Sequence, residues 1–396
     1  MKVRFKTFGC RLNRAESLAL EAEFLERGWT LTETSADADL VVVRGCSVTR
    51  RAQAECENYL ARLEREYPFK RVVATGCLPR RRNEYIIEGL RKPAAPVVPQ
   101  RTGRAWLKAQ DGCNARCSFC IVPRFRGNSV SVPFMEVVDS AKRFADAGYG
   151  EIVLTGCNLV QYSCDGKRLP ELVAALAAVG GCRIRVGSLE PGAVALETIA
   201  AMAAAPAACR YLHFSVQSGS NRILAAMRRP YLASDVHEAA GAALKAMPGV
   251  SLGCDMIAGF PGETFNDHLA SLSLLKSGGF SRAHVFPYSE RPGTAAEAMG
   301  PVVRKGERSA RAHELAAVAG EQRLRYAARF RGKTVELAVE DAKAAAGWSS
   351  EYLWCKAADA HAALSMRAER RKLLRAKVAK VAGDTLLCEP AAGEDA

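Results

Sequence analysis

The feature that most constrains this chain is a cysteine-rich stretch, Asp111–Gly127, with the sequence DGCNARCSFCIVPRFRG. Cys113, Cys117 and Cys120 form a C-x3-C-x2-C triplet, and three thiolates so close together can face one inorganic centre. A structural zinc site closes its shell with four protein ligands. A four-iron cluster held by three cysteines instead keeps one iron open to a small molecule. The triplet therefore predicts an iron–sulfur cluster, with a zinc knuckle completed from elsewhere as the alternative.

Length, charge and cysteine content set broad bounds on the protein. A chain of 396 residues is long enough for two or three domains, each with its own core. Its formal net charge of +14 favours a polyanionic partner such as RNA or DNA, with an ordinary basic surface as the alternative. Fourteen cysteines in a cytoplasmic chain would indicate metal or redox chemistry rather than a disulfide framework.

The apolar pattern predicts where the protein resides. No uninterrupted apolar run approaches the ~20 residues that a membrane-spanning helix needs. The first residues, MKVRFKTFGC, predict a strand and lack the apolar core of a signal peptide. We therefore expect a cytoplasmic protein without a membrane partner.

A strand, a Gly-Cys pair and a helix recur three times before residue 99. The expected strands are Val3–Phe8, Leu40–Arg44 and Arg71–Thr75, and the expected helices are Arg14–Arg27, Thr49–Tyr67 and Asn83–Leu90. Strands that alternate with helices predict a parallel sheet with right-handed crossovers, whose ligand sites lie beyond the carboxyl ends of the strands. The three Gly-Cys pairs should therefore converge on one edge of the sheet.

Cys10, Cys46 and Cys77 of these pairs form a second three-cysteine set, again one ligand short of a closed shell. Glycine gives the backbone room at each turn, and the helix N-termini behind the thiols favour thiolates. Small residues that only pack beneath turns are the alternative. The stretch Arg91–Gly103 (RKPAAPVVPQRTG) has three prolines and is expected to be an extended linker.

Strand–helix alternation resumes after the linker and continues to Thr294. The expected strands are Ala105–Ala109, Glu151–Thr155, Arg183–Ser188, Arg210–Val216, Ser251–Ile257 and Phe280–Phe286. Six such units predict a partial, open parallel barrel with its active site at the carboxyl ends of the strands. The first cysteine loop begins directly after the first of these strands, which is where a barrel of this kind carries its site.

The string KAQDGCNARCSFCIVPRFRG around the first triplet resembles the radical S-adenosylmethionine (SAM) methylthiotransferase family. The chain start, TFGCRLNRAES, is similar to the family's T-x-G-C-x-x-N-x-x-E/D-S pattern, and Gly259–Thr264 (GFPGET) is a string specific to the family. One departure is Arg44-Gly45 before Cys46, where the family usually has Asn-Thr. This departure is expected to alter a hydrogen bond around the ligand.

The resemblance implies an α/β fold in three parts. These are an N-terminal flavodoxin-like parallel-sheet domain (1–99), a central partial (β/α)6 radical SAM barrel (104–330) and a small C-terminal TRAM-like β-barrel (331–396). It also implies that the cofactors are SAM and two [4Fe-4S] clusters, with one cluster on each cysteine triplet.

Candidate SAM contacts lie at the strand ends and beside the cluster. Phe119 would shield the cluster edge, Glu190 is an acid on the barrel rim, and Arg228 offers a cation, although Glu190 could also be a solvated loop carboxylate. The other candidates are Thr155, Gly156, Ser215 and Gln217, the last two within HFSVQSGS, which resembles the family's Q-S-G-S motif. Asp255 is a candidate for a polar contact in the site, whereas the GFPGET string that follows it is expected mainly to shape a rigid turn.

Not every Gly-Cys pair is expected to bind a metal. Cys157 follows Thr155-Gly156 and repeats the pattern, but the family pattern does not require a cysteine there. It is predicted to be structural, together with Cys164, Cys182, Cys209, Cys254, Cys355 and Cys388.

The C-terminal region predicts a charged helix over Arg304–Phe330 and then a small β-barrel. Its short alternating stretches are Val335–Glu340, Tyr352–Lys356, Lys377–Val381 and Thr385–Glu389. A cationic run in this region contains Arg367, Arg370, Arg371, Lys372, Arg375, Lys377 and Lys380. A barrel with such a run resembles the RNA-binding TRAM domain, and a merely solvated charged face is the alternative. Trp348, Tyr352 and Trp354 could stack on bases, but two of the three are expected in the core.

The family resemblance implies an enzyme that methylthiolates C2 of N6-threonylcarbamoyladenosine at position 37 of tRNA, whose unpaired base can enter a pocket. TFGCRLN, GCSVT and SLEP are most similar to this branch of the family. The implied partners are the tRNA anticodon stem-loop and an electron donor such as flavodoxin or ferredoxin. The alternatives are N6-isopentenyladenosine-37 or a ribosomal-protein aspartate as substrate, another radical SAM product, or a non-catalytic iron–sulfur protein that carries electrons or binds RNA.

Overall fold

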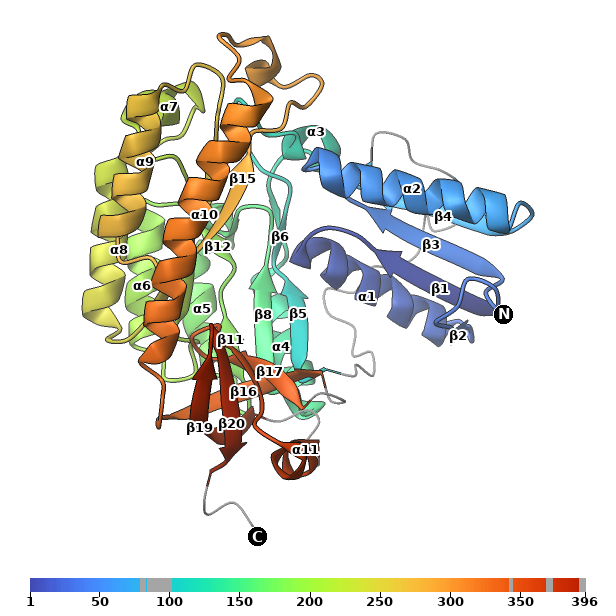
Figure 1. Cartoon of the computed structure of the whole chain (residues 1–396). Helices are drawn as coiled ribbons and strands as arrows, with labels where there is room; N and C mark the ends of the chain where they lie inside the picture. The colour runs from blue at the N-terminus through green and yellow to red at the C-terminus, as the bar shows by residue number, and fades with distance from the viewer. Residues whose placement is uncertain (79–82, 84–101, 342–344, 368–372, 392–396) are drawn as a thin grey trace.

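Three groups of elements make up the computed structural model of this chain, as Figure 1 shows. The N-terminal sheet and its helices (blue) lie to one side of the central strands and helices, and the C-terminal strands (red) lie below them. The structure describes residues 1–78, 83, 102–341, 345–367 and 373–391.

The N-terminal sheet is parallel, with the strand order β2-β1-β3-β4. Its elements are β1 (Lys2–Thr7), α1 (Arg11–Glu26), β2 (Thr30–Leu31), β3 (Leu40–Gly45), α2 (Arg50–Glu66) and β4 (Arg71–Gly76). Side chains of β3 alternate between two small cores because successive residues of a strand point to opposite faces. Val41 belongs to the core that holds Leu63 of α2, whereas Val42 belongs to the core that holds Phe24 of α1.

The predicted succession of strand, Gly-Cys pair and helix is confirmed for its first two copies. In the third copy the strand and Cys77 are found as predicted. The helix predicted at Asn83–Leu90 lies outside the described residues except for residue 83, as does the linker predicted at Arg91–Gly103 except for its last two residues.

The central strands are parallel and neighbour one another in chain order. They are β5 (Arg104–Lys108), β8 (Glu151–Thr155), β11 (Arg183–Arg185), β12 (Ser188–Leu189), β13 (Tyr211–Gln217), β14 (Ser251–Ala258) and β15 (Arg282–Pro287). They form two sheets, β11-β8-β5 and β12-β13-β14-β15. The strand predicted at Arg183–Ser188 is broken into β11 and β12. Between them, an added Cβ at Gly187 would lie only 3.0 Å from the backbone oxygen of Leu154, which explains the glycine.

Helices cover the outer face of these strands, and the main hydrophobic core lies between the two layers. They are α4 (Phe134–Asp146), α5 (Leu169–Ala177), α6 (Ala193–Ala203), α7 (Asn221–Ala226), α8 (Ala233–Ala246), α9 (Phe265–Ser277) and α10 (Lys305–Ala328). The shorter elements are β6 (Gln110–Asp111), α3 (Val122–Arg126), β7 (Val130–Ser131), η2 (Leu159–Gln161), β9 (Ser163–Cys164), β10 (Lys167–Arg168) and η3 (Ala295–Ala298). Among the helices that the structure describes, none combines the length and apolar character needed to cross a bilayer.

The C-terminal strands close into a barrel in the order β16-β17-β18-β20-β19. The elements are β16 (Thr334–Asp341), β17 (Ala346–Ser349), β18 (Trp354–Ala357), α11 (Ala360–Arg367), β19 (Leu373–Ala382) and β20 (Thr385–Pro390). The barrel sits where the central strands begin, since Arg183 and Arg185 donate to the backbone oxygens of Glu336 and Ser349 at 2.7 and 2.8 Å. It therefore lies at the opposite end of the central strands from the cysteine loop.

The small barrel confirms the predicted fold class, although the sequence did not predict β17. Trp348 stacks on Tyr352 with ring centroids 4.4 Å apart, and the Tyr352 side chain is buried against arginines of the central strands. Of the predicted cationic run, Arg375, Lys377 and Lys380 are exposed on β19. The cations at 370, 371 and 372 lie outside the described residues.

Candidate functional site

The loop that carries the first triplet is built on a short pair of strands. β6 follows β5 and pairs with β7, which returns the chain after the loop. Gln110 of β6 donates from its amide nitrogen to the backbone oxygen of Gly112 at 2.7 Å and to the hydroxyl of Ser129 at 2.8 Å. Gly112 has φ +65°, and an added Cβ would lie 1.9 Å from the backbone oxygen of Asn128. Only glycine suits this turn.

An arginine contacts the first triplet. The Arg229 guanidinium donates to the Cys117 thiol at 3.0 Å and forms an ion pair of 2.7 Å with Glu190. The amide of Asn158 donates to the other Glu190 oxygen at 2.9 Å. Burial raises the pKa of Cys117, and it raises the pKa of Cys120 to about 12. The predicted SAM contact Glu190 is therefore linked to the triplet through Arg229.

The cation beside this triplet is Arg229 rather than the predicted Arg228. Arg228 is exposed and has φ +57°, two residues after the end of α7. Arg229 has little exposed surface and also donates to the backbone oxygen of Ser215 at 3.2 Å. The left-handed turn at Arg228 decides which of the two adjacent arginines is buried, and the MRRPY string alone does not reveal it. Contact between Arg228 and SAM stays a prediction.

The second triplet gathers at the carboxyl edge of the N-terminal sheet. Cys10 precedes α1, whereas Cys46 and Cys77 follow β3 and β4. Gly9 has φ +97°, and a Cβ there would lie 2.8 Å from the Cys46 sulfur, so the glycine lets Cys46 approach the chain beside Cys10. Burial raises the pKa of Cys46 to about 11, with smaller contributions from the neighbouring Cys10 and Cys77 thiols. The predicted convergence of the three Gly-Cys pairs is therefore observed.

Arg126, the last residue of α3, links the two triplets. Its Nε donates to the Cys77 sulfur at 3.1 Å, and its Nη2 donates to the Asn13 side chain at 2.6 Å. Its Nη1 contacts Glu16 of α1 at 3.1 Å and Asp111 beside the first triplet at 2.9 Å. One guanidinium thus joins the first cysteine loop to the N-terminal sheet.

Glu16 is the anionic centre of this junction. Although burial opposes its ionisation, Arg44, Arg126 and Lys108 together hold the pKa of Glu16 below its usual range. The Lys108 ammonium lies 2.7 Å from Glu16, and Arg44 forms an ion pair with the same carboxylate. Arg44, where the sequence departs from the family pattern, therefore helps to hold the carboxylate that contacts the central elements.

The spacing of the thiols distinguishes two kinds of metal centre. Zinc binds thiolates at about 2.3 Å, which places the sulfurs around one ion about 4 Å apart. Among the residues that the structure describes, only one group of three potential ligands has its ligand atoms within 4.8 Å of one another. It consists of His213, Asp255 and His284. Neither cysteine triplet closes to the spacing of a single zinc ion. Three thiols at one site are a donor set that suits a four-iron cluster with one open iron.

The charges around the thiols also suit an anionic cluster. Arginine donors reach a sulfur of each triplet, and hydrogen bonds to sulfur are among the factors that set the potential of an iron–sulfur cluster. Arg291 is 3% exposed, and its Nε and Nη2 have no hydrogen-bond partner. It lies close enough to Cys46 to interact electrostatically with that thiol. A cluster on the second triplet would place anionic sulfur near these orphaned donors.

One cavity of about 390 Å³ is bordered by a thiol from each triplet, Cys10 and Cys120. Phe119 and Gln217, two of the predicted SAM contacts, line it, and Asp255 supplies a carboxylate. Most of the remaining wall is apolar and comes from Val48, Ile121, Val122, Ile257, Phe286 and Pro287. The structure therefore brings both triplets to one cavity at the carboxyl ends of the central strands.

Three other predicted SAM contacts lie outside the described lining of this cavity. Thr155 is buried at the end of β8. Gly156 packs so closely that an added Cβ would lie 2.8 Å from the Gln110 side-chain oxygen, which explains this glycine without a ligand. The backbone oxygen of Ser215 accepts from the Tyr231 hydroxyl. Contact between these residues and SAM stays a prediction.

Sequence reasoning missed the three arginines that accompany the thiols. Arg126 is inside the cysteine-loop string and Arg229 is beside a predicted residue, but neither position reveals a sulfur contact. Arg291 lies in a loop after β15. Its proximity to Cys46 depends on how the N-terminal sheet packs, which no local pattern encodes.

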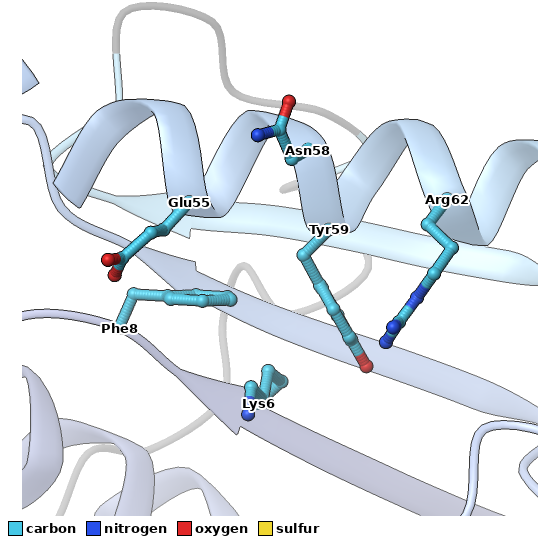
Figure 2. A pocket seen from close by; sticks show the side chains of 6 residues that line it. All are labelled: Lys6, Phe8, Glu55, Asn58, Tyr59 and Arg62. Carbon is cyan, nitrogen blue, oxygen red and sulfur yellow. The ribbon is translucent and has the colours of Figure 1, made fainter. Parts of the chain in front are cut away.

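A second depression, of about 470 Å³, lies on the N-terminal sheet, as Figure 2 shows. Its lining consists of Lys6, Phe8, Glu55, Asn58, Tyr59 and Arg62. The rings of Phe8 and Tyr59 lie 5.6 Å apart, with the Lys6 ammonium over both. It shares no described lining residue with the cavity between the triplets.

Two family models match the chain in succession. The model described as "Uncharacterized protein family UPF0004" covers residues 2–95, and the model of the radical SAM superfamily covers residues 107–275. Among solved structures, the radical SAM methyltransferase TsrM from Kitasatospora setae, with cobalamin and a [4Fe-4S] cluster bound, is similar with a TM-score of 0.55. That likeness has 14% identity and covers 75% of this chain and 77% of the other. It shows a shared fold.

Curated relatives match most of the chain. The threonylcarbamoyladenosine tRNA methylthiotransferase MtaB of Bacillus subtilis is 31% identical, over 86% of this chain and 85% of the relative. The tRNA-2-methylthio-N(6)-dimethylallyladenosine synthase of Chlorobium phaeobacteroides is 32% identical over 81% of each chain. Members of this family use SAM and [4Fe-4S] clusters. The chain therefore belongs to the radical SAM methylthiotransferase family, whose members are enzymes that transfer a methylthio group.

Proposed function

We propose that this chain methylthiolates C2 of N6-threonylcarbamoyladenosine at position 37 of tRNA. The observation that carries the proposal is the single cavity bordered by Cys10 and Cys120, because one acceptor placed there could be reached from both triplets. Cys113, Cys117 and Cys120 would hold the cluster that binds SAM, and Cys10, Cys46 and Cys77 would hold the auxiliary cluster. When bound, the first cluster supplies radical chemistry and the second supplies sulfur.

The chain's own residues bind, orient and shield in this proposal. Phe119, Ile257 and Phe286 line the cavity with apolar surface, which excludes water from a reactive acceptor. Arg229 holds Glu190 beside the first triplet, where the carboxylate could receive the SAM ammonium. Gln217 lines the cavity with φ +71°, and a left-handed non-glycine residue of this kind often marks a functional site.

A basic recess adjoins the cavity and suits an anionic substrate. The recess, of about 860 Å³, shares Thr49 and the Phe286–Ser289 segment with the cavity. Its charged lining consists of Arg50, Arg51, Lys305, Arg308 and Glu290. The threonylcarbamoyl group carries a carboxylate and RNA carries phosphates, whereas an isopentenyl group has no charge. Relatives with either substrate name match at similar identity, so identity does not distinguish the two substrates. The positive charge of the recess favours the threonylcarbamoyl group.

The same proposal includes the partners and the limits of the domains. The tRNA would present its anticodon stem-loop, and a flavodoxin or ferredoxin would supply electrons in the cytoplasm. Domains at 1–99, 104–330 and 331–396 are supported by the two family-model matches and by the separate C-terminal barrel. Exposed Arg375, Lys377 and Lys380 support a TRAM-like role in RNA binding for that barrel.

The test uses reconstituted protein with SAM, reductant and tRNA that carries N6-threonylcarbamoyladenosine, followed by nucleoside mass spectrometry. The expected product is the 2-methylthio derivative. Cys10→Ala and Cys120→Ala should abolish it, whereas Cys164→Ala, a partly exposed cysteine outside both triplets, should retain it. Product only on isopentenyladenosine tRNA, or only on a ribosomal-protein peptide, would contradict the substrate assignment.

A further inference from the structure

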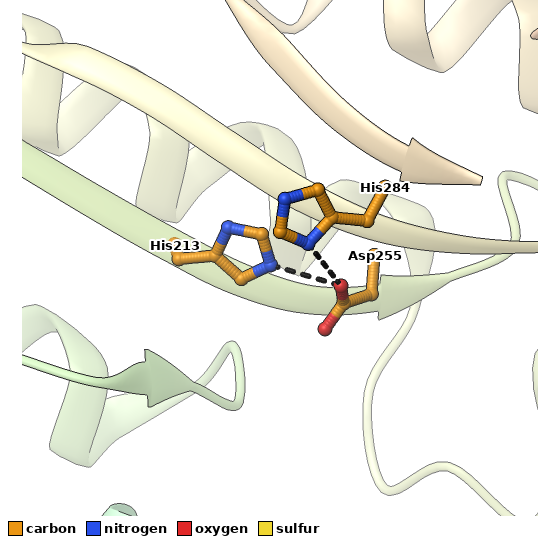
Figure 3. A group of neighbouring side chains, drawn as sticks. All are labelled: His213, Asp255 and His284. Carbon is orange, nitrogen blue, oxygen red and sulfur yellow. Dashed lines mark ion pairs between the residues drawn. The ribbon is translucent and has the colours of Figure 1, made fainter. Parts of the chain in front are cut away.

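Asp255 is the one carboxylate among the described residues that line the cavity between the triplets. It lies on β14 between His213 of β13 and His284 of β15, as Figure 3 shows. His213 Nε2 lies 3.1 Å and His284 Nδ1 lies 3.3 Å from the same oxygen, Asp255 Oδ1. Two neighbouring strands thus hold one acid at the cavity wall.

Other contacts fix how the two imidazoles face the acid. Arg282 Nε donates to His284 Nε2 at 3.2 Å, so the proton of a neutral His284 lies on Nδ1, toward Asp255. His213 Nδ1 lies 2.8 Å from the Tyr211 hydroxyl. Although burial opposes its ionisation, hydrogen bonds from both histidines hold the pKa of Asp255 well below its usual range.

The same contacts argue against a metal ion on these three side chains. A histidine that binds a metal usually donates its second ring N–H to a carboxylate, a carbonyl or water. The second ring nitrogen of His284 instead accepts from a guanidinium, which leaves Nδ1 protonated and without a lone pair for a metal. The arrangement therefore suits an anion held by two N–H donors.

The second oxygen of this carboxylate is available to a ligand. The ion pairs of both histidines run to Oδ1, and Figure 3 shows the second oxygen, Oδ2, pointing away from both rings. The neighbouring cavity wall at Ile257 and Phe286 is apolar. The Asp255 side chain is 24% exposed, so water can reach it when no ligand is bound. Once a ligand displaces that water, a charged acceptor here is costly without a donor, and a ligand that offers an N–H gains a strong hydrogen bond.

We propose that Asp255 Oδ2 accepts a hydrogen bond from the N6–H of the substrate adenosine, an inference that rests on the proposed function. An adenosine with a single substituent on N6 keeps one N–H, so this contact reads the base and tolerates different substituents. The basic recess would then receive the anionic substituent away from Asp255. Asp255 is a specificity-determining residue in this account, and His213 and His284 are positioning residues.

The test is a cycle of two proteins and two substrates. Anticodon stem-loops carry either N6-threonylcarbamoyladenosine or its N6-methyl derivative, which lacks the N–H, and kcat/KM is measured with wild type and Asp255→Asn. Wild type should prefer the N6–H substrate by roughly 10- to 100-fold, the range for a hydrogen bond to a charged group. Asp255→Asn should reduce this preference to less than about threefold. The variant lacks the charged acceptor, so the presence or absence of the N6–H in the substrate no longer matters to it.

The outcomes separate this inference from the function on which it rests. No turnover of either stem-loop by wild type would contradict the proposed function and the inference with it. Turnover with a wild-type preference below about threefold would overturn the Asp255 contact alone, whether or not the variant folds. A preference that persists in Asp255→Asn would also overturn it.

Controls distinguish recognition of the base from other roles. Asp139→Asn, an exposed acid on α4, should keep the wild-type preference. In Asp255→Asn the loss of kcat/KM on the N6–H stem-loop should exceed any loss of tRNA-independent SAM cleavage by at least about tenfold. Equal losses of both activities would indicate that Asp255 acts on SAM rather than on the base. A metal other than iron that is present in the wild type and absent from the variant would identify a metal site. Either result would overturn the inference.

Discussion

The Arg126 Nε and the Cys77 sulfur lie 3.1 Å apart, although Arg126 ends the first cysteine loop and Cys77 follows a strand of the N-terminal sheet. The same guanidinium contacts Asp111 before the first triplet and Glu16 of α1. The position of the second triplet is thereby coupled to the loop that carries the first. This coupling places both triplets at the edge of one cavity.

Replacing Arg126 should change the cluster on the second triplet. Arg126→Leu removes a charged donor from a sulfur ligand, and the loss of such a hydrogen bond makes a cluster harder to reduce. Taking ~1.4 kcal/mol for the contact, we expect a midpoint potential lower by about 60 mV for one electron. Redox titration monitored by electron paramagnetic resonance measures the shift.

Arg124→Leu is the matched control for Arg126. It removes an exposed arginine from the same helix, whose contact is with the backbone oxygen of Pro292. Its potentials should match those of wild type. Equal shifts in both variants, or none in Arg126→Leu, would show that the Cys77 contact does not affect the cluster.

A buried carboxylate should be essential to stability. Glu151 is fully buried among Arg104, Arg183 and Arg185 at 2.7–2.9 Å, where the central strands meet the small barrel. Glu151→Gln removes the carboxylate that three buried guanidinium groups share, and among the described residues only Arg104 and Arg183 keep a second one, on Glu340 and Glu336. We therefore expect the free energy of unfolding to fall by roughly 3–5 kcal/mol. Chemical denaturation at pH 7 measures it. Glu197→Gln, in an exposed ion pair with Arg168, should cost less than about 1 kcal/mol.

The contribution of Glu151 should also depend on pH. Although burial opposes its ionisation, the three arginines hold its folded pKa well below the value of an unfolded glutamate. The stabilisation is therefore present above the unfolded pKa, about 4.3, and is lost as the pH falls toward the lower folded pKa. The difference in unfolding free energy between wild type and Glu151→Gln should shrink from pH 7 toward pH 3. A difference that stays constant would contradict this ionisation.

Cations of the recess should bind RNA through charge. Arg50 and Lys305 are exposed lining residues, and each phosphate contact contributes about 0.7–0.9 to the slope of log affinity against log salt. Arg50→Glu with Lys305→Glu should weaken binding of the anticodon stem-loop and lower that slope by about 1.5. Filter binding at several salt concentrations measures both quantities. Lys142→Glu, an exposed cation on α4, should leave the slope unchanged, and an unaltered slope in the double variant would exclude the recess.

Much of the fold follows from local patterns in the sequence. β3, with the sequence LVVVRG, is an apolar run that ends in Gly-Cys, and such a run predicts a strand buried on both faces. The convergence of Cys10, Cys46 and Cys77 follows because parallel strands place equivalent positions on one edge. The cysteine triplets could therefore be chosen from sequence alone.

Features that depend on packing could not be predicted. The break between β11 and β12 falls at Gly187, where the chain passes close to Leu154 of another strand. The group of His213, Asp255 and His284 depends on the register of three strands that are separated by helices. β17, with the sequence AGWS, is too short and too weakly alternating to indicate a strand. Each case involves contacts between residues that are distant in sequence.

Iron content tests the central claim that each cysteine triplet holds a four-iron cluster. Anaerobically reconstituted wild type should hold about eight irons per chain. The triple alanine variant at positions 10, 46 and 77 and the triple alanine variant at positions 113, 117 and 120 should each hold about four. About four irons in the wild type, with no loss when the N-terminal cysteines are replaced, would contradict the account.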